Sequence, residues 1–249
     1  MAEIRAPRLA VLIDADNASA KIADGLFEEI AKIGEASVRR IYGDFSGTRL
    51  KSWADVLPTH AITASQNFAN TVGKNASDIA LVIEAMDLLH SGRFDGFCLV
   101  SSDSDFTRLA SRIREQGVDV YGFGEQKTPE SFRQACRRFI YTENLLPAAV
   151  SAPNRSEPDG TSGKALKPPS AAMPLIRKAI TQLDDEDGWV RLGAVGTQLS
   201  NLASDFDSRT YGQPKLMSLV EKTGGFEIKK ENGMVSIRPK ARAKSKSET

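Results

Sequence analysis

Two apolar runs that each lead into a pair of aspartates constrain the fold of this chain more than any other feature. The run 9–13 ends in the segment 14–17 (Asp-Ala-Asp-Asn), and the run 96–100 is followed by the segment 101–105 (Ser-Ser-Asp-Ser-Asp). After each segment, apolar residues recur at intervals of three and four, which predicts a helix. A buried strand that ends in acidic residues before a helix is typical of open α/β sheets, whose ligands bind at the carboxyl ends of the strands.

A third carboxylate belongs to the same pattern. Asp78 opens a long predicted helix, 79–89, after the polar lead 73–77. If the two acidic strands lie parallel and adjacent, Asp14, Asp78 and Asp103 can converge on one point.

Strands and helices alternate throughout the first 145 residues, which predicts an α/β domain with a parallel sheet and helices on both faces. The predicted strands are 9–14, 37–42, 61–64, 96–100, 118–123 and 139–141, and the predicted helices are 18–33, 48–56, 79–89, 105–116 and 129–137.

Three motifs in this order resemble the NYN domain, a branch of the PIN-like nucleases. They are Asp14-x-x-Asn17 after the first strand, Gly73-Lys74-x-x-x-Asp78 at a helix start, and Ser101-x-Asp103-x-Asp105-Phe106 after the fourth strand. The resemblance covers about residues 8–144. It implies a Rossmann-like, three-layer α/β/α fold and a metal-dependent ribonuclease activity on RNA.

By residue match, the resemblance also implies roles for individual side chains. The expected metal ligands are Asp14, Asp78 and Asp103, with Asp105 as a second acid near the site and Asn17 orienting the scissile phosphate or a water. Possible contacts to phosphate are Lys74, Ser101 and Ser102, of which the two serines could instead hydrogen-bond the carboxylates. Asp16 is not required by the first motif and is expected to face solvent.

Carboxylates that share a cleft need a counter-charge. Two of them 4 Å apart repel by about 1 kcal/mol in water and by about 4 kcal/mol at an effective dielectric constant of 20. A divalent cation offsets this repulsion, and oxygen ligands favour Mg²⁺ or Mn²⁺ over zinc. With two histidines and two cysteines in the chain, a classical zinc cluster is not expected.

Simpler interpretations remain open for the same residues. Asp and Asn after a strand often cap a helix, Asp105 can act only on the helix dipole, and Lys74 can be a solvated loop residue. The segment 14–16 also meets the Asp-x-Asp motif of haloacid dehalogenase phosphatases, in which Asp14 would be a nucleophile. In that family, however, Thr or Val stands where this chain has Ala18.

Residues 146–169 are rich in Pro, Ser, Gly and Ala, which predicts a flexible linker. Beyond it, predicted helices at 174–183, 192–202 and 214–223 precede two strands, 226–230 and 234–237. The pair Asn232-Gly233 between these strands is a strong hairpin signal. Helices followed by a small hairpin indicate a winged-helix domain at 170–238, and the basic tail 239–249 is expected to be disordered.

The second domain resembles the LOTUS domain, also called OST-HTH. The resemblance is carried by Trp189-Val190, Phe206-Asp207-x-x-x-Tyr211-Gly212, Leu216, Leu219 and Phe226. It implies a module that binds RNA or a protein partner. Trp189 and Tyr211 are expected to be core aromatics rather than platforms for RNA bases.

Charge and composition favour a protein that binds nucleic acid over one that spans a membrane. Residues 1–145 carry 17 Lys and Arg against 20 Asp and Glu, whereas residues 146–249 carry 16 against 12, so the second half is the more basic. That half is expected to help hold a phosphate backbone. Lacking an apolar run of the ~18 residues that a membrane span needs, the chain is expected to be cytoplasmic and not to bind a membrane.

Two functions therefore compete. The first is a ribonuclease that cleaves single-stranded RNA at the aspartate cluster. The second is a non-catalytic RNA-binding or scaffold protein in which the first domain binds metal weakly and the second recruits a partner.

Overall fold

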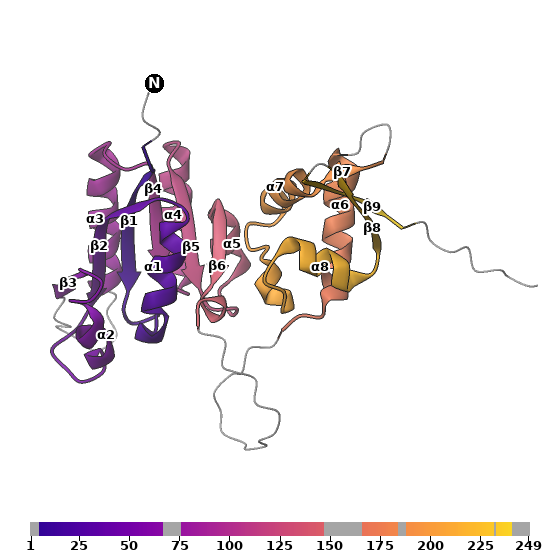
Figure 1. Ribbon diagram of the computed structural model, residues 1–249. Helices are drawn as coiled ribbons and strands as arrows, with labels where there is room; N and C mark the ends of the chain where they lie inside the picture. Colours follow the sequence, from indigo (N-terminus) through magenta and orange to yellow (C-terminus); the bar gives the residue numbers. More distant parts are fainter. Residues whose placement is uncertain (1–4, 67–75, 147–165, 184–187, 232, 241–249) are drawn as a thin grey trace, which may run out of the picture. The chain divides into compact units, whose positions relative to one another are not determined.

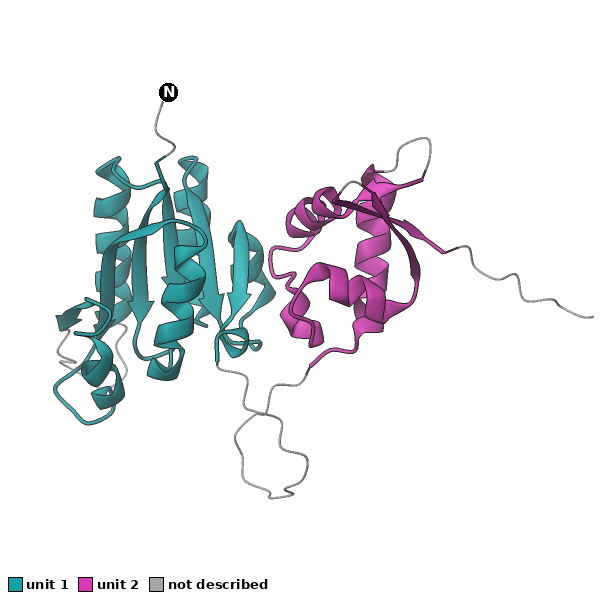
Figure 2. Ribbon diagram, in the orientation of Figure 1, with its two compact units in different colours: residues 1–161 teal, residues 162–249 magenta. Residues whose placement is uncertain are grey.

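The computed structural model describes residues 5–66, 76–146, 166–183, 188–231 and 233–240. The chain divides into two compact units, residues 1–161 and 162–249 (Figure 2). Each unit has its own apolar core. Lys74 of the second motif and Asn232 of the predicted hairpin turn lie outside the described residues.

Unit 1 is built on a six-stranded sheet in the order β3-β2-β1-β4-β5-β6. All five neighbouring pairs are parallel. The strands are β1 (Arg8–Asp14), β2 (Glu35–Gly43), β3 (Thr63–Gln66), β4 (Gly96–Val100), β5 (Asp119–Gly124) and β6 (Arg138–Tyr141). The chain proceeds outward from β1 to β3 and then returns to place β4 on the other side of β1. This reversal is the switch point at which open α/β sheets bind ligands.

Helices cover both faces of the sheet (Figure 1), as the alternating sequence pattern predicts. The α-helices are α1 (Ala23–Ala31), α2 (Lys51–Val56), α3 (Ala76–His90), α4 (Thr107–Glu115) and α5 (Glu130–Ala135), and 3₁₀ turns lie at Ala20–Ile22, Ser104–Phe106 and Thr142–Asn144. One apolar cluster joins one face of the sheet to α3, α4 and α5. A second cluster joins the other face to α1 and α2.

Strict alternation along β1 decides which way its last residue points. Leu9, Val11 and Ile13 belong to the cluster with α1 and α2, whereas Ala10 and Leu12 belong to the cluster with α3. Because successive side chains of a strand point to opposite faces, Asp14 continues the series of Ala10 and Leu12. It therefore points to the face that carries α3.

The predicted elements of unit 1 all occur, with corrected ends. The predicted helices at 18–33 and 105–116 each begin with a 3₁₀ turn, so the α-helices start only at Ala23 and Thr107. The predicted strand 61–64 begins two residues late, at Thr63, because Ala61 adopts a left-handed φ of 50° in the preceding turn. The remaining ends differ by three residues or fewer.

Unit 2 has the predicted winged-helix arrangement. It contains a 3₁₀ turn (Pro169–Ala172), α6 (Met173–Leu183), β7 (Val190–Arg191), α7 (Leu192–Leu202), a second turn (Ser208–Tyr211), α8 (Leu216–Thr223), β8 (Phe226–Glu231) and β9 (Met234–Pro239). The sheet is antiparallel in the order β7-β9-β8. Its core gathers apolar side chains from the three helices and from the hairpin, including Ile176, Leu199, Leu219 and Ile237.

Unit 2 begins before the predicted end of the linker at residue 169. Lys167 N–H donates a 3.0 Å hydrogen bond to the carbonyl of Thr210, and a 3₁₀ turn begins at Pro169, so described structure of this unit precedes residue 170. Most of the predicted linker 146–169 lies outside the described residues, and its extent stays a prediction. No helix in the described part of the chain is long and apolar enough to cross a membrane.

Candidate active site

Asp14 is the most deeply placed carboxylate at the carboxyl end of the sheet. It ends β1 and is 1% exposed. Its Oδ2 accepts hydrogen bonds from Ser101 Oγ (2.7 Å) and Asn17 Nδ2 (2.8 Å), and its Oδ1 accepts one from Asp16 N–H (3.0 Å). Burial raises the pKa of Asp14, and these three hydrogen bonds oppose that rise. The carboxylate is therefore fixed in orientation.

Ser101 connects the two acidic strand ends. β1 and β4 run in parallel with Ile13 beside Val100, so the next residues, Asp14 and Ser101, also lie side by side. Ser101 is 2% exposed, and its hydroxyl oxygen accepts a hydrogen bond from Asp103 N–H (3.0 Å) while its proton goes to Asp14. One side chain thus fixes both Asp14 and the backbone of the segment that carries Asp103.

Asp78 faces this pair from the first turn of α3. Burial, followed by the negative charges of Asp14, Asp103, Asp16 and Asp105, raises the pKa of Asp78 to about 6. The influence of four other carboxylates on one group indicates that Asp78 lies near the acidic segments that follow β1 and β4. That Asp14, Asp78 and Asp103 form one site stays a prediction.

The same side chains do not form a ready coordination shell. Within the described ranges, no three Asp, Glu, His or Cys side chains are grouped closely enough to hold a metal ion. The carboxylates therefore act on one another through their charges. Their chemistry still fits a hard divalent cation, because every donor is a carboxylate oxygen and the negative charge on Asp78 is disfavoured until a cation offsets it.

Helix capping accounts for one of the two acidic segments. Asp103 is the N-cap of the 3₁₀ turn Ser104–Phe106, and its Oδ1 accepts from Asp105 N–H at 2.9 Å. At the first segment, by contrast, the N-cap is Ser19, whose hydroxyl accepts from Lys21 N–H. Asp14 and Asn17 thus bond to one another and do not cap the following helix.

Asp105 and Asp16 are both exposed at the rim of the site. Asp105 lies in the first turn after its capping neighbour, so a dipole role remains compatible with its position. Asp16 faces outward, as expected, but is also engaged: its Oδ1 forms an ion pair with Arg49, and its Oδ2 accepts a hydrogen bond from Ser77 Oγ at 3.5 Å.

Arg49 and Ser77 are site residues that the sequence reasoning missed. Arg49 lies in the loop before α2, and Ser77 lies in the first turn of α3. They reach Asp16 across 33 and 61 residues of chain. No local pattern signals such a contact, because it depends on how the loops after β1 and β2 and the start of α3 pack together.

Two further residues, Ser102 and Lys74, were predicted to contact phosphate. The hydroxyl oxygen of Ser102 accepts a 2.9 Å hydrogen bond from Glu125 N–H after β5, which leaves its proton to donate. Its contact with a carboxylate or a phosphate stays a prediction. Lys74 lies outside the described residues, so its contact with phosphate stays a prediction.

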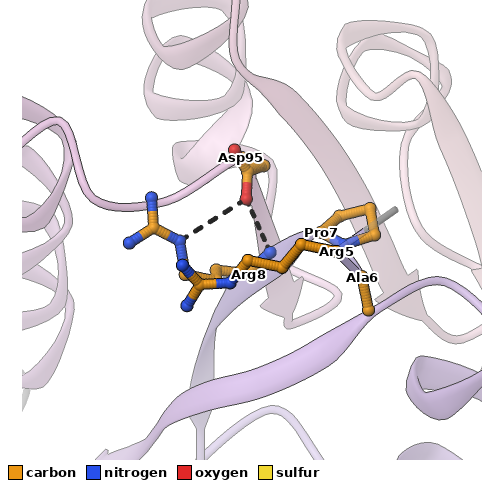
Figure 3. Close-up of a pocket in the computed structure, with 5 residues that line it drawn as sticks. All are labelled: Arg5, Ala6, Pro7, Arg8 and Asp95. Carbon is orange, nitrogen blue, oxygen red and sulfur yellow. Dashed lines mark hydrogen bonds and ion pairs between the residues drawn. The ribbon is translucent and has the colours of Figure 1, made fainter. Parts of the chain in front are cut away.

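A separate hollow lies at the other edge of the sheet, where β1 and β4 begin. It is lined by Arg5, Ala6, Pro7, Arg8 and Asp95 (Figure 3). Arg8 N–H donates to Asp95 Oδ2 at 2.7 Å, and Arg8 Nε lies 3.7 Å from the same oxygen. This pair ties the amino ends of the two strands together and is not part of the acidic site.

In unit 2, the two aromatic residues predicted to lie in the core, Tyr211 and Trp189, differ in their packing. Tyr211 packs at the edge of the core with its ring 6.0 Å from that of Phe206. Trp189 is half-buried, and the guanidinium carbon of Arg238 lies 4.7 Å from its ring centroid. Trp189 therefore lies under a cation at the hairpin rather than inside the core.

Two protein families match the chain. The family model of the NYN domain matches residues 8–146, and that of the OST-HTH/LOTUS domain matches residues 167–237. No individually curated protein matches the chain significantly. Among solved structures, a protein of unknown function from Vibrio parahaemolyticus is 17% identical, with a TM-score of 0.49, over 59% of this chain and 99% of that one. An uncharacterized protein from Nitrosomonas europaea is 28% identical, with a TM-score of 0.28, over 39% of this chain and 95% of that one.

Proposed function

The chain belongs to the NYN domain family, and from this premise we propose that it is a divalent-metal-dependent ribonuclease that hydrolyses phosphodiester bonds of single-stranded RNA. The observation that carries the proposal is the mutual influence of the carboxylates at the switch point. Asp78, with a pKa raised to about 6 by burial and by four other acids, reports a concentration of negative charge that is costly without a cation.

The donor set fits Mg²⁺ or Mn²⁺, and Asp14, Asp78 and Asp103 would hold the ion. When bound, such an ion supplies Lewis-acid stabilisation of the phosphodiester and lowers the pKa of a water molecule. Asp14 retains acceptor capacity for this role, because each carboxylate oxygen has more than one lone pair and the three hydrogen bonds are shared between two oxygens.

The surrounding side chains set the geometry of the acids. Ser101 and Asn17 hold Oδ2 of Asp14, so this carboxylate has one orientation when substrate arrives. Asn17 also has an amide oxygen and a second N–H with which to orient a water or a phosphate oxygen. Asp105, exposed beside Asp103, is the second acid at the solvent side of the site.

Unit 2 supplies binding rather than chemistry in this proposal. It matches the OST-HTH/LOTUS family model, which suggests RNA binding. Exposed cationic side chains on its surface that could contact phosphates include Arg191, Lys215, Lys229, Lys230 and Lys240. A tethered RNA-binding module raises the local concentration of RNA at the acidic site without new contacts there.

The decisive experiment is cleavage of a labelled single-stranded RNA by the full chain, with Mn²⁺ or Mg²⁺ and with EDTA. Asp78→Asn and Asp103→Asn are expected to abolish cleavage while the protein stays folded. Asp87→Asn is the matched control, because Asp87 is an exposed acid on the same helix as Asp78 and should leave activity unchanged.

One observation favours the rival function, an RNA-binding or scaffold protein without catalysis: the described acids are not gathered at coordinating distance. Metal-independent RNA binding with no cleavage of several structured and unstructured RNAs would support this rival. Equal cleavage by wild type and Asp103→Asn would contradict the proposed site. The haloacid dehalogenase alternative has no support from the matched families.

A further inference from the structure

A hollow of about 220 Å³ opens directly beside the acidic site. It lies between the segment after β1 and the start of α2, and its walls include Ala15, Asp16, Ala18, Arg49, Ser52 and Trp53. Asp16, which lines the hollow, also belongs to the acidic site, because its backbone N–H donates to Oδ1 of Asp14 and its charge acts on Asp78. The hollow therefore opens at the rim of the acidic site, on the face of the sheet that carries α1 and α2.

The walls of the hollow are mostly polar, with buried apolar side chains at its base. Trp53 and Ala15 are buried, at 1% and 3% exposure, and the indole N–H of Trp53 donates a 2.9 Å hydrogen bond to the carbonyl of Ala18. This bond fixes the tryptophan at the base of the hollow. Ser52 and Arg49 are exposed at the rim. A polar, anionic sugar-phosphate segment matches this distribution.

Arg49 is held at the rim through Asp16. The two side chains form an ion pair, and the backbone N–H of Asp16 donates to Oδ1 of Asp14. A guanidinium has five N–H donors in a planar fork, so a bond to one carboxylate oxygen leaves donors for a phosphate. The Arg49 side chain is 70% exposed, so these donors are accessible to an incoming strand.

We propose that this hollow seats the sugar-phosphate of the nucleotide next to the scissile phosphate, with Arg49 binding a backbone phosphate at its rim. The inference rests on the proposed ribonuclease function and names its substrate subsite. Asp16 is a positioning residue in this arrangement, because it holds Arg49 at the rim. The guanidinium also offsets the repulsion between RNA phosphates and the neighbouring carboxylates.

The first test removes the guanidinium. Binding of a short fluorescein-labelled single-stranded RNA to the full chain is measured by anisotropy in EDTA over a range of salt concentrations. Arg49→Ala is expected to weaken binding by about tenfold, the scale of a hydrogen bond to a charged group. It should also reduce the steepness of the salt dependence by about 0.7, the value for one lost contact with single-stranded nucleic acid. Arg49→Lys should keep the salt dependence but recover only part of the affinity.

Arg112→Ala is the matched control for Arg49→Ala. Arg112 is also an exposed arginine paired with an acid, Glu115, but it lies on α4 and does not line the hollow. It is expected to leave affinity and salt dependence unchanged. If Arg49→Ala and Arg112→Ala give the same binding curve at every salt concentration, the phosphate contact is refuted.

The second test fills the hollow. Ser52→Phe places a ring at its rim, whereas Ala54→Phe places the same ring on an exposed position of α2 that does not line it. Only Ser52→Phe should weaken RNA binding, by about tenfold, with the melting temperatures of the two variants alike. Equal RNA affinity in the two variants would overturn the nucleotide seat.

Cleavage kinetics separate the role of Asp16 from a structural one. Asp16→Asn should raise KM more than it changes kcat, because it loosens Arg49 directly and reaches the other acids only through its charge. A fall in kcat with unchanged KM would show that Asp16 does not act by holding Arg49.

If wild type does not cleave RNA but Arg49→Ala still loses binding, the ribonuclease proposal fails and the nucleotide seat stands. If wild type cleaves RNA and Arg49→Ala changes neither binding nor cleavage, the nucleotide seat fails and the ribonuclease proposal stands.

Discussion

The hydroxyl of Ser101 donates a 2.7 Å hydrogen bond to Oδ2 of Asp14, across the junction between β4 and β1. Both residues are buried, and they are 87 positions apart in the chain. The bond therefore exists only when the two central strands are paired in register. It couples the correct assembly of the sheet to the orientation of the central acid of the site.

Ser101→Ala should both destabilise the fold and impair the site. It leaves Asp14 Oδ2 with one donor fewer and deprives Asp103 N–H of its acceptor. Loss of a partner for a buried polar group costs about 1–3 kcal/mol. Urea unfolding should report that loss in the free energy of unfolding, and cleavage should fall because Asp14 is less firmly oriented.

The control for this prediction is Ser131→Ala, at an exposed position on α5. It should change the free energy of unfolding by less than about 0.5 kcal/mol, as surface substitutions usually do. A Ser101→Ala variant as stable and as active as Ser131→Ala would show that the bond to Asp14 is dispensable.

Asp78 predicts a pH dependence of stability in metal-free buffer. Its pKa rises from 3.8 to about 6 on folding, so the folded state binds a proton more tightly than the unfolded state. The resulting stabilisation is fully present below about pH 4 and is lost as the pH rises through about 6. Asp78→Asn should flatten this part of the profile, measured by urea unfolding in EDTA, whereas Asp87→Asn should not.

A divalent cation should reverse this loss. Above about pH 6 Asp78 is ionised and repelled by its neighbours, so added Mg²⁺ or Mn²⁺ should raise the melting temperature more there than near pH 4. In Asp78→Asn the increase should be smaller. The same increase in wild type at both pH values would argue against a cation site that includes Asp78.

The fold was predictable from the sequence because its signals are local. Apolar runs, helical spacing and the turn residues that separate them determine each element and the parallel alternation of unit 1. The ends were less predictable: 3₁₀ turns precede α1 and α4, and the backbone of Ala61 delays β3. These details depend on packing against neighbouring elements, which no short window of sequence contains.

The residues of the site likewise fall into those with a local sequence signature and those without one. Asp14, Asp78 and Asp103 carry a local signature, since each lies at a strand end or helix start that the sequence marks. Arg49 and Ser77 carry none, because their meeting with Asp16 depends on loops that converge from distant parts of the chain. The hydrogen bond from Glu125 N–H to the hydroxyl oxygen of Ser102 has no local signature either, because it joins segments that follow two different strands.

Gly25 should tolerate no side chain although it lies in a helix. A Cβ at this position of α1 would lie 2.2 Å from the carbonyl oxygen of Leu145, which is backbone and cannot move aside easily. In open space, Gly→Ala in a helix gains up to about 1 kcal/mol. Gly193, in α7, has such space and provides the control. Gly25→Ala should lower the melting temperature of unit 1, and Gly193→Ala should raise that of unit 2. A stabilising Gly25→Ala would contradict the close approach of α1 to Leu145.

The two-unit organisation makes a kinetic prediction. Removal of residues 147–249 leaves the acidic site and its core intact, because both lie within residues 8–146. If unit 2 captures RNA for that site, the truncated chain should show a raised KM with a much smaller change in kcat. Unit 2 added as a separate chain should not restore KM at equal concentration, since the gain comes from the tether. An unchanged KM after truncation would show that unit 1 binds its RNA alone and that unit 2 serves another partner.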